Sequence, residues 1–219
     1  TVRFVIMELF FYSIMGAALG FVIKQLVNWL NVNQYMMKNN NVILESIGAI
    51  SVLWSFSHLP VIEASIFSMI VVLLVGISII DYHTFQIPLI FVIIGIIGTI
   101  FGVVFDVIYF SAALLGVFIG AVIPMMIVGL LWSITKRQGM GFGDIQLGIV
   151  LGAWLGPMRM AITLFFAAFM SLLVWMGVSL VKGFDKDRAL PFGPFLSIAG
   201  IGTYIGSFYY PEFFHLLMI

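Results

Sequence analysis

The chain has 219 residues, of which 63% are apolar and only 8% are charged, whereas an average globular domain carries roughly 25% charged residues. So few charged groups cannot cover a soluble fold of this size, so the composition excludes a soluble domain and predicts an all-α integral membrane protein. Nine Lys plus Arg balance nine Asp plus Glu and Cys is absent, so we expect no nucleic-acid partner, no disulfide and no metal site.

The predicted elements are membrane-crossing helices. About 20 apolar residues cross a bilayer as a helix, and polar or Gly- and Pro-rich stretches separate successive crossings. The sequence predicts a polytopic bundle of about eight transmembrane helices forming one membrane-embedded domain, residues 1–219. In chain order the predicted spans are Phe4–Leu30, Val42–Ser57, Val61–Ile80, Ile87–Phe105, Val107–Ile134, Asp144–Gly156, Met160–Val181 and Phe192–Phe208.

The distribution of cations predicts the orientation, because short cytoplasmic loops retain Lys and Arg. Seven cations follow the first, fifth and seventh spans, and two lie on the opposite side: Lys24, Lys38, Lys136, Arg137, Lys182, Lys186 and Arg188 against Arg3 and Arg159. Both termini are therefore expected outside, and the loop predicted after the third span, Asp81–Gln86, is expected on the cytoplasmic side.

Nine acids are few enough that each can be weighed, because an ionisable group in a bilayer is costly. Most have an ordinary explanation as solvated span ends, loop residues or a snorkelling side chain: Glu63, Asp106, Glu212, Asp185, Asp187 and Glu8. The acids left for chemistry are Glu45, Asp81 and Asp144.

Asp81 follows the apolar run Met69–Ile80 and marks the expected cytoplasmic end of the third span. Pro88 can then start the next helix, because its fixed backbone angle suits the first helical turn. His83 lies two residues after Asp81, where it either tunes the field of a site or is an ordinary exposed loop histidine.

Asp144 ends a stretch with glycine at alternate positions, Gly139, Gly141 and Gly143, at the start of the sixth span. Such glycines disfavour regular helix and permit tight turns or close approach of the backbone. An Asp at this place can also be the N-cap of the next helix, which is the structural alternative to a chemical role.

Asp81 and Asp144 are expected at one membrane face, where they could act as a pair. Two neighbouring carboxylates share a proton, so one can take a proton from water while the other donates to a peptide oxygen. The same acids would also suit a proton-coupled transporter, although only one Gly-rich break is seen and no internal repeat. A non-catalytic assembly protein, with these motifs as caps, is the other alternative.

At these residues the sequence resembles the type IV prepilin peptidase family, membrane aspartyl proteases with a Gly-x-Gly-Asp signature. The similarity rests on four stretches in the same order: Glu45 with Gly48, Asp81 to Pro88, Gly139 to Gly156, and Pro191 to Leu196. It implies that Asp81 and Asp144 are the catalytic pair and that Gly141 and Gly143 shape the turn holding Asp144.

The resemblance also implies partners and a location. The substrates would be prepilins or pseudopilins, whose short basic leader is cut at the cytoplasmic face of the bacterial inner membrane. Glu45 would receive a basic leader residue or pair internally with Lys38, and Pro191 and Pro194 would break the backbone before the last span or line the extended substrate. The bilayer itself is the other partner.

The chain departs from many bacterial members in lacking the two Cys pairs that bind zinc between the first two spans, where only residues 31–41 lie. An archaeal preflagellin-type peptidase also lacks that domain, but the stretch Pro191–Leu196 favours the bacterial group. Proteolysis needs no cofactor, whereas methylation of the new N-terminus would use S-adenosylmethionine, for which the sequence shows no independent binding signature.

Overall fold

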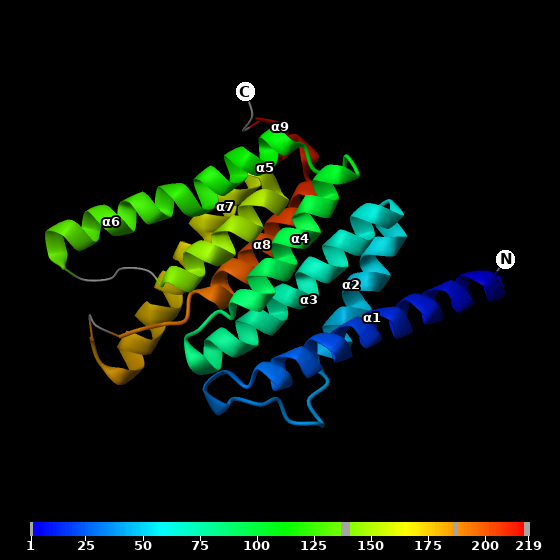
Figure 1. The fold of residues 1–219 in the computed structure, drawn as a ribbon, viewed down its shortest axis with the longest axis horizontal. Helices are drawn as coiled ribbons and strands as arrows, with labels where there is room; N and C mark the ends of the chain where they lie inside the picture. The colour runs from blue at the N-terminus through cyan, green and yellow to red at the C-terminus, as the bar shows by residue number, and fades with distance from the viewer. Residues whose placement is uncertain (1, 137–140, 186–187, 217–219) are drawn as a thin grey trace. The chain divides into compact units, whose positions relative to one another are not determined.

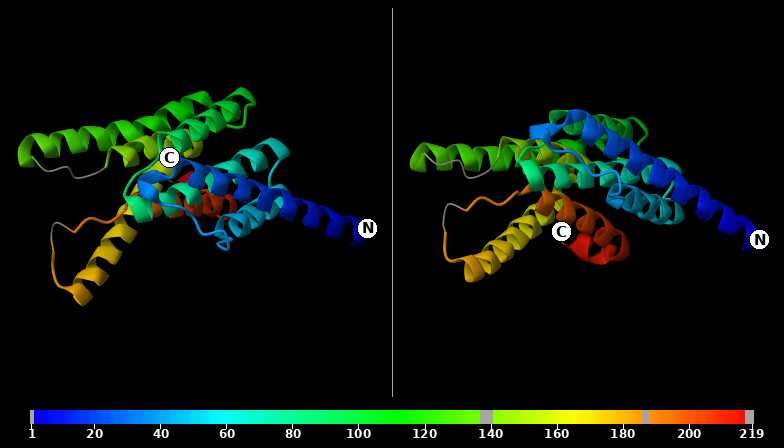
Figure 2. Two further views of the ribbon diagram at one scale, coloured as in Figure 1. Left: turned by 60° about the horizontal axis from the view of Figure 1, so that its bottom comes forward. Right: turned by 90° about the horizontal axis from the view of Figure 1, so that it is seen from below.

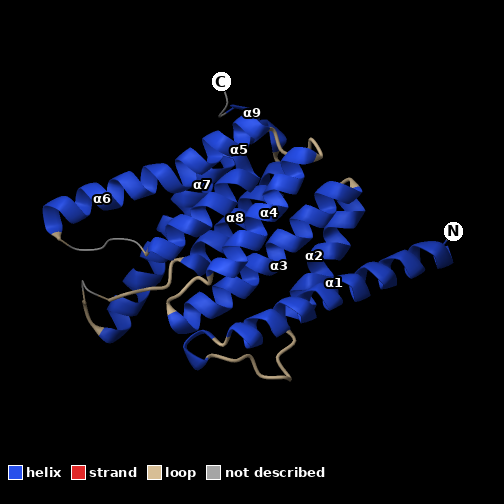
Figure 3. Ribbon diagram, in the orientation of Figure 1, coloured by secondary structure: helices blue, strands red, loops and turns tan. Residues whose placement is uncertain are grey.

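The computed structural model describes residues 2–136, 141–185 and 188–216, and the elements in these ranges are helices (Figure 3). They are α1 (Val2–Leu30), the 3₁₀ turn η1 (Val32–Gln34), α2 (Ile43–His58), α3 (Val61–Thr84), α4 (Leu89–Val104), α5 (Phe110–Val117), the π-helical turn η2 (Phe118–Val122), α6 (Ile123–Thr135), α7 (Phe142–Lys182), α8 (Gly193–Tyr209) and α9 (Pro211–Leu216). The all-α prediction is confirmed.

Helix length and composition fit a membrane protein. Among the described residues, four helical stretches are long and apolar enough to cross a bilayer: Met7–Leu30, Val61–Thr84, Phe110–Thr135 and Phe142–Lys182. Many large apolar side chains, such as Phe10, Phe118 and Leu180, are exposed, which a lipid environment accommodates and water does not. The protein is therefore a helical membrane protein.

The chain divides into two compact units, Thr1–Ile108 and Tyr109–Ile219. Unit 1 contains α1 to α4 and unit 2 contains α5 to α9 (Figure 1). Each unit is described by itself. The prediction of one domain over residues 1–219 stays a prediction.

In unit 1, α3 packs against each of α1, α2 and α4. It is the most buried of the long apolar helices, because Ile70, Leu74 and Ile77 have almost no exposed surface. Glycines bring α1 and α2 together: Gly16 meets Gly48, and Gly20 meets the backbone of Leu44, so the two helices run antiparallel. Small residues allow such close approach of backbones in lipid.

Close contacts at glycines also bring helices together in unit 2. Gly116 meets Gly152 and Gly120 meets Gly148, which packs α5 and η2 antiparallel to the first half of α7. The helix α6 continues from η2 and runs past the rest of the unit (Figures 1 and 2), and its described side chains from Met125 onward are almost all exposed. On the other side of α7, the Trp154 ring stacks on Tyr204 of α8 at 4.8 Å.

The sixth and seventh predicted spans form one helical element, α7, but Gly156 breaks its backbone. Gly156 has φ of 75° and ψ of 178°, and Pro157 follows it. Both ends of α7 lie at the same side of unit 2 in Figure 1, because the chain doubles back at this glycine. Glycine suits the position because other residues rarely adopt positive φ, and Pro157 then has no helical donor to lose.

Two predicted span boundaries were wrong by a turn or less. The segment Asp81–Thr84, expected in a loop, is the last turn of α3, since nothing breaks the helix before Phe85 adopts a left-handed φ of 55°. The sixth span, expected to begin at Asp144, begins at Phe142. The short helix α9 was not predicted.

Candidate active site

Asp81 lies in the last turn of α3 and is only 4% exposed. Its backbone carbonyl accepts a hydrogen bond from the Phe85 N–H at 2.8 Å, which closes the helix. The side chain of Asp81 therefore lies at the C-terminal end of α3, shielded from solvent.

Asp144 lies in the first turn of α7, three residues after the N-cap, and is 9% exposed. Its Oδ2 accepts the Gly141 N–H at 3.2 Å, and its own N–H donates to the Gly141 carbonyl at 3.2 Å. The alternative that Asp144 is itself the N-cap is wrong, because Gly141 holds that position. The side chain of Asp144 therefore lies at the N-terminal end of α7, held by a hydrogen bond within its own turn.

The glycines before Asp144 contribute differently from the expectation. Gly141 has φ of −69°, so positive φ is not the reason for glycine here. A Cβ at Gly141 would lie 3.0 Å from Asp144 Oδ2, so glycine leaves room for the carboxylate. Gly143 is helical, which contradicts its predicted place in a turn. Gly139 lies outside the described residues.

The prolines flank helix starts. Pro88 is the N-cap of α4, with φ of −67° and ψ of 128°, rather than its first helical residue. Pro191 precedes α8 and Pro194 lies in the first turn of that helix. The predicted break in the backbone before α8 is confirmed, whereas a contact of these prolines with substrate stays a prediction.

Glu45 forms an internal ion pair, but with a different partner from the one expected. Its Oε1 accepts a hydrogen bond from the Lys24 ammonium at 3.0 Å, and Lys38 is not that partner. Glu45 Oε2 is buried and has no hydrogen-bond partner among the described residues. Lys24 therefore belongs to the interior of unit 1, which leaves six cations against two for the orientation argument.

His83 is an exposed residue of α3, not a loop residue. Its Nδ1 lies 2.8 Å from the Ile79 carbonyl, and its ring stacks on Tyr35 with centroids 4.4 Å apart. Partial burial raises the pKa of the Tyr35 hydroxyl above its ordinary value of 10.0. Sequence reasoning missed this contact and the role of Lys24, although a lysine inside an apolar run was a signal that it needs a partner.

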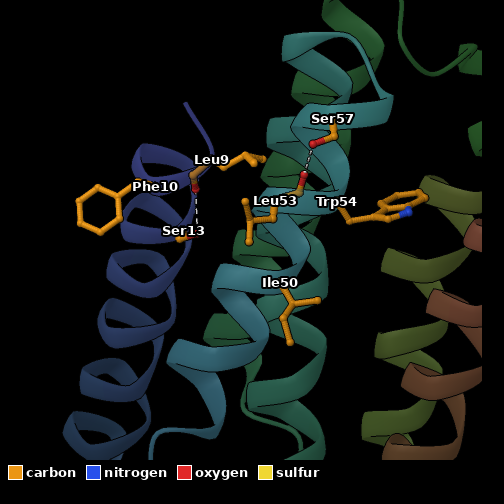
Figure 4. A pocket seen from close by; sticks show the side chains of 7 residues that line it. All are labelled: Leu9, Phe10, Ser13, Ile50, Leu53, Trp54 and Ser57. Atoms are coloured by element: carbon orange, nitrogen blue, oxygen red, sulfur yellow. Dashed lines mark hydrogen bonds between the residues drawn. The ribbon is translucent and has the colours of Figure 1, made fainter. Parts of the chain in front are cut away.

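A groove in unit 1 is apolar and is not lined by either acid. It lies between α1 and α2, at the end of α2 away from Glu45, and is lined by Leu9, Phe10, Ser13, Ile50, Leu53, Trp54 and Ser57 (Figure 4). Two serine hydroxyls are its only side-chain hydrogen-bonding groups apart from the Trp54 N–H. In the part of the chain that the structure describes, no three His, Cys, Asp or Glu side chains gather to hold a metal.

The structure leaves the pairing of the two acids as a prediction, since Asp81 belongs to unit 1 and Asp144 to unit 2. The structure gives the local environment of each acid within its own unit. One acid ends a helix and the other begins one, and both are among the few buried acidic side chains of the described chain.

Comparison with known proteins finds relatives that match about half of this chain. The prepilin leader peptidase/N-methyltransferase of Dichelobacter nodosus is 35% identical over 111 residues, which are 51% of this chain and 36% of that protein. The protein of the same name from Aeromonas hydrophila is 29% identical over 103 residues, 47% of this chain and 36% of that protein. The chain thus spans about a third of the length of these relatives, and no solved structure matches it.

The family model for the type IV leader peptidase family matches residues 66–176, about half of the chain. Asp81, Gly141 and Asp144 all lie inside the matched range, whereas Glu45, Pro191 and Pro194 lie outside it. With Asp81 and the Gly-x-Gly-Asp stretch that ends at Asp144 both inside a match of this extent, the chain belongs to the type IV leader peptidase family.

Proposed function

We propose that this protein is a membrane aspartyl endopeptidase that removes the basic leader from type IV prepilins or pseudopilins, with Asp81 and Asp144 as its catalytic pair. The observation that carries the proposal is that the family match contains both buried acids, each at a helix end. Its relatives are named for the same activity, and the rest of the chain is poor in other catalytic side chains.

The reaction needs one ionised and one protonated carboxyl. The ionised carboxylate takes a proton from water, whose oxygen attacks the carbonyl carbon of the scissile peptide bond. The protonated partner donates to the carbonyl oxygen as negative charge develops there. The C–N bond then breaks as the acid that took the proton from water passes it to the leaving nitrogen, and the proton donated to the carbonyl oxygen returns to its partner, so both carboxyls regain their starting states.

We assign the role of base to Asp144, whose Oδ2 accepts the Gly141 N–H at the N-terminal end of α7. The role of acid then falls to Asp81, in the last turn of α3. No metal takes part in this scheme.

We also propose where the reaction occurs and what contacts the leader. The site faces the cytoplasm at the bacterial inner membrane, with both termini outside, on the remaining charge bias of the loops. Glu45 is proposed to receive a basic leader residue through Oε2, which is buried and has no hydrogen-bond partner among the described residues, while Oε1 holds Lys24. His83, Pro191 and Pro194 are proposed to lie along the extended leader.

Methylation of the new N-terminus by S-adenosylmethionine stays separate from this proposal. That cofactor needs partners for its ribose hydroxyls and its charged amino-acid end. The groove between α1 and α2 is lined by apolar side chains with two serines, and no acid or base lines it. The described residues there do not fit the cofactor, so no methyl-transfer step is derived.

The test is cleavage of a prepilin by membranes containing Asp81→Asn or Asp144→Asn. Asn at either position keeps the size of the side chain, and at 144 its oxygen can still accept the Gly141 N–H. We expect each variant to accumulate normally and to lose activity about a thousandfold or more. Asp106→Asn, at an exposed acid with a left-handed backbone that Asn tolerates, is the matched control.

Mass spectrometry of the prepilin reports the loss of the leader and, independently, any added methyl group. Unimpaired cleavage by either variant at the catalytic positions would overturn the assignment. Loss of cleavage by the Asp106→Asn control would mean that the assay reports general damage to the membrane protein.

A further inference from the structure

The segment 31–41 between α1 and α2, here called the strap, has an unusual backbone. Asn31, Asn33 and Gln34 all adopt left-handed φ angles, of 43°, 49° and 66°. This conformation is sterically unfavourable for residues other than glycine, although Asn tolerates it better than most. A conformation of this kind persists where surrounding contacts hold it in place.

Lys24 supplies the first of these contacts. It is 4% exposed, and its ammonium donates to the carbonyls of Asn39 at 3.0 Å and Asn41 at 2.5 Å. The third donor goes to Glu45 Oε1 at 3.0 Å. An ammonium has three protons, so this lysine is fully satisfied by two strap carbonyls and one carboxylate.

Asn28 supplies the second contact, one turn further along α1. Its Oδ1 accepts the Met37 N–H at 2.7 Å, and its Nδ2 donates to the Met37 carbonyl at 3.4 Å. The Met37 side chain is buried. The middle of the strap is therefore fixed to α1 through both backbone groups of one residue.

The strap in turn touches the end of α3. Tyr35 stacks on His83 with an angle of 22° between the rings. The Ile79 carbonyl can only accept, so His83 Nδ1 carries the proton and donates to it. One edge of the imidazole is tied to α3 and one face to the strap, two residues after Asp81.

We propose that the strap is a positioning device for Asp81, with Lys24 and Tyr35 as its positioning residues. Lys24 holds the strap, Tyr35 carries the restraint to His83, and the last turn of α3 is kept closed by the Phe85 N–H to Asp81 carbonyl bond. The catalytic part of this inference rests on the proposed function of Asp81. The mechanical part does not.

The first experiment compares Tyr35→Leu with Tyr35→Phe in nanodiscs. Phe keeps the ring and loses only the hydroxyl, so it is the matched control for the stack. An aromatic pair is worth enough to change a local opening equilibrium by about two- to tenfold. We expect Tyr35→Leu to speed hydrogen exchange of the Phe85 amide by that factor, and Tyr35→Phe to leave it near wild type.

The second measurement is the kinetics of prepilin cleavage by the same proteins. Misplacing Asp81 affects the chemical step, so kcat should fall about two- to tenfold in Tyr35→Leu with KM unchanged, and Tyr35→Phe should restore it. Unchanged exchange at Phe85 overturns the proposal. Faster exchange with unchanged kcat overturns the catalytic part. If wild type cleaves nothing, the proposed function fails while the exchange result still tests the strap.

Lys24 needs a double variant, because Lys24→Met alone leaves Glu45 buried without its counter-ion and can fail to fold. Lys24→Met with Glu45→Gln removes both charges. We expect this double variant to accumulate but to show faster exchange at Met37 and Phe85, because the carbonyls of Asn39 and Asn41 have lost their donor. Exchange at both amides equal to wild type would overturn the role of Lys24.

Discussion

Unit 1 and unit 2 hold their buried acids by different means. Asp144 in unit 2 depends on a contact within one turn, the hydrogen bond from Gly141. Asp81 in unit 1 lies at the end of a helix that a strap from another part of the chain touches through Tyr35 and His83. An acid at the start of a helix can therefore be held by contacts within its own turn, whereas an acid at the end of a helix depends more on tertiary contacts.

The largest effect on stability should come from the glycine contacts between α1 and α2 and between α5 and α7, here called the glycine seams. A Cβ added at these glycines would meet the backbone of the facing helix. In Gly16→Ala the new methyl overlaps the backbone of Gly48, and in Gly116→Ala it overlaps that of Gly152. Overpacking of this kind costs about 1–3 kcal/mol. We expect both variants to lose that much in the free energy of unfolding, measured by SDS titration in mixed micelles.

The two seams should nevertheless differ in what they do to the acids. Gly16→Ala displaces α2, which carries Glu45, so exchange at Phe85 should also rise. Gly116→Ala moves α5 against α7 but leaves the Gly141 to Asp144 bond within its own turn. Gly129→Ala, where a Cβ meets nothing within 4 Å, is the control and should gain stability. Equal exchange at Phe85 in both seam variants would remove the contrast between the units.

The second prediction concerns the local contact itself. Asp144→Ala removes the acceptor for the Gly141 N–H, and loss of such a cap costs about 1 kcal/mol. Asp144→Asn keeps an acceptor and should cost little. The free energies of unfolding of the two variants, measured side by side, give this difference. Equal losses would mean that charge at the start of α7, not the hydrogen bond, holds the turn.

The same contrast explains what the sequence could predict. The position of Asp144 at a helix start follows from local signals, a glycine-rich break and a following apolar run, so the predicted start was wrong by only two residues. The end of α3 was harder, because no Gly or Pro stands between Asp81 and Phe85 and the helix continued through the expected loop. The helical spans themselves were predictable because apolar length alone decides them.

Long-range pairing lay beyond the sequence. The sequence favoured Lys38, which is close to Glu45 in the chain, and only the fold of the strap brings the more distant Lys24 to that carboxylate. The stack of Tyr35 on His83 has no periodic signal, because one ring lies in an irregular segment and the other on a helix. Such contacts depend on the direction that the strap takes after its left-handed residues, and no local pattern in the sequence gives that direction.

The smallest predicted effects concern two helix ends, one in each unit, that close on a left-handed residue other than glycine. Phe85 ends α3 in unit 1 with φ of 55°, and Lys136 ends α6 in unit 2 with φ of 56°. Glycine adopts this conformation without steric cost, so each residue changed to Gly should gain about 0.5–1 kcal/mol, offset by lost side-chain contacts. Lys136 lies 4.8 Å from the centre of the Trp132 ring, a contact that glycine loses.

We therefore expect a larger gain for Phe85→Gly than for Lys136→Gly in SDS titration. The reverse order would mean that Phe85 packs against groups that stabilise the end of α3, and would assign the closure of that turn to Phe85 as well as to the strap.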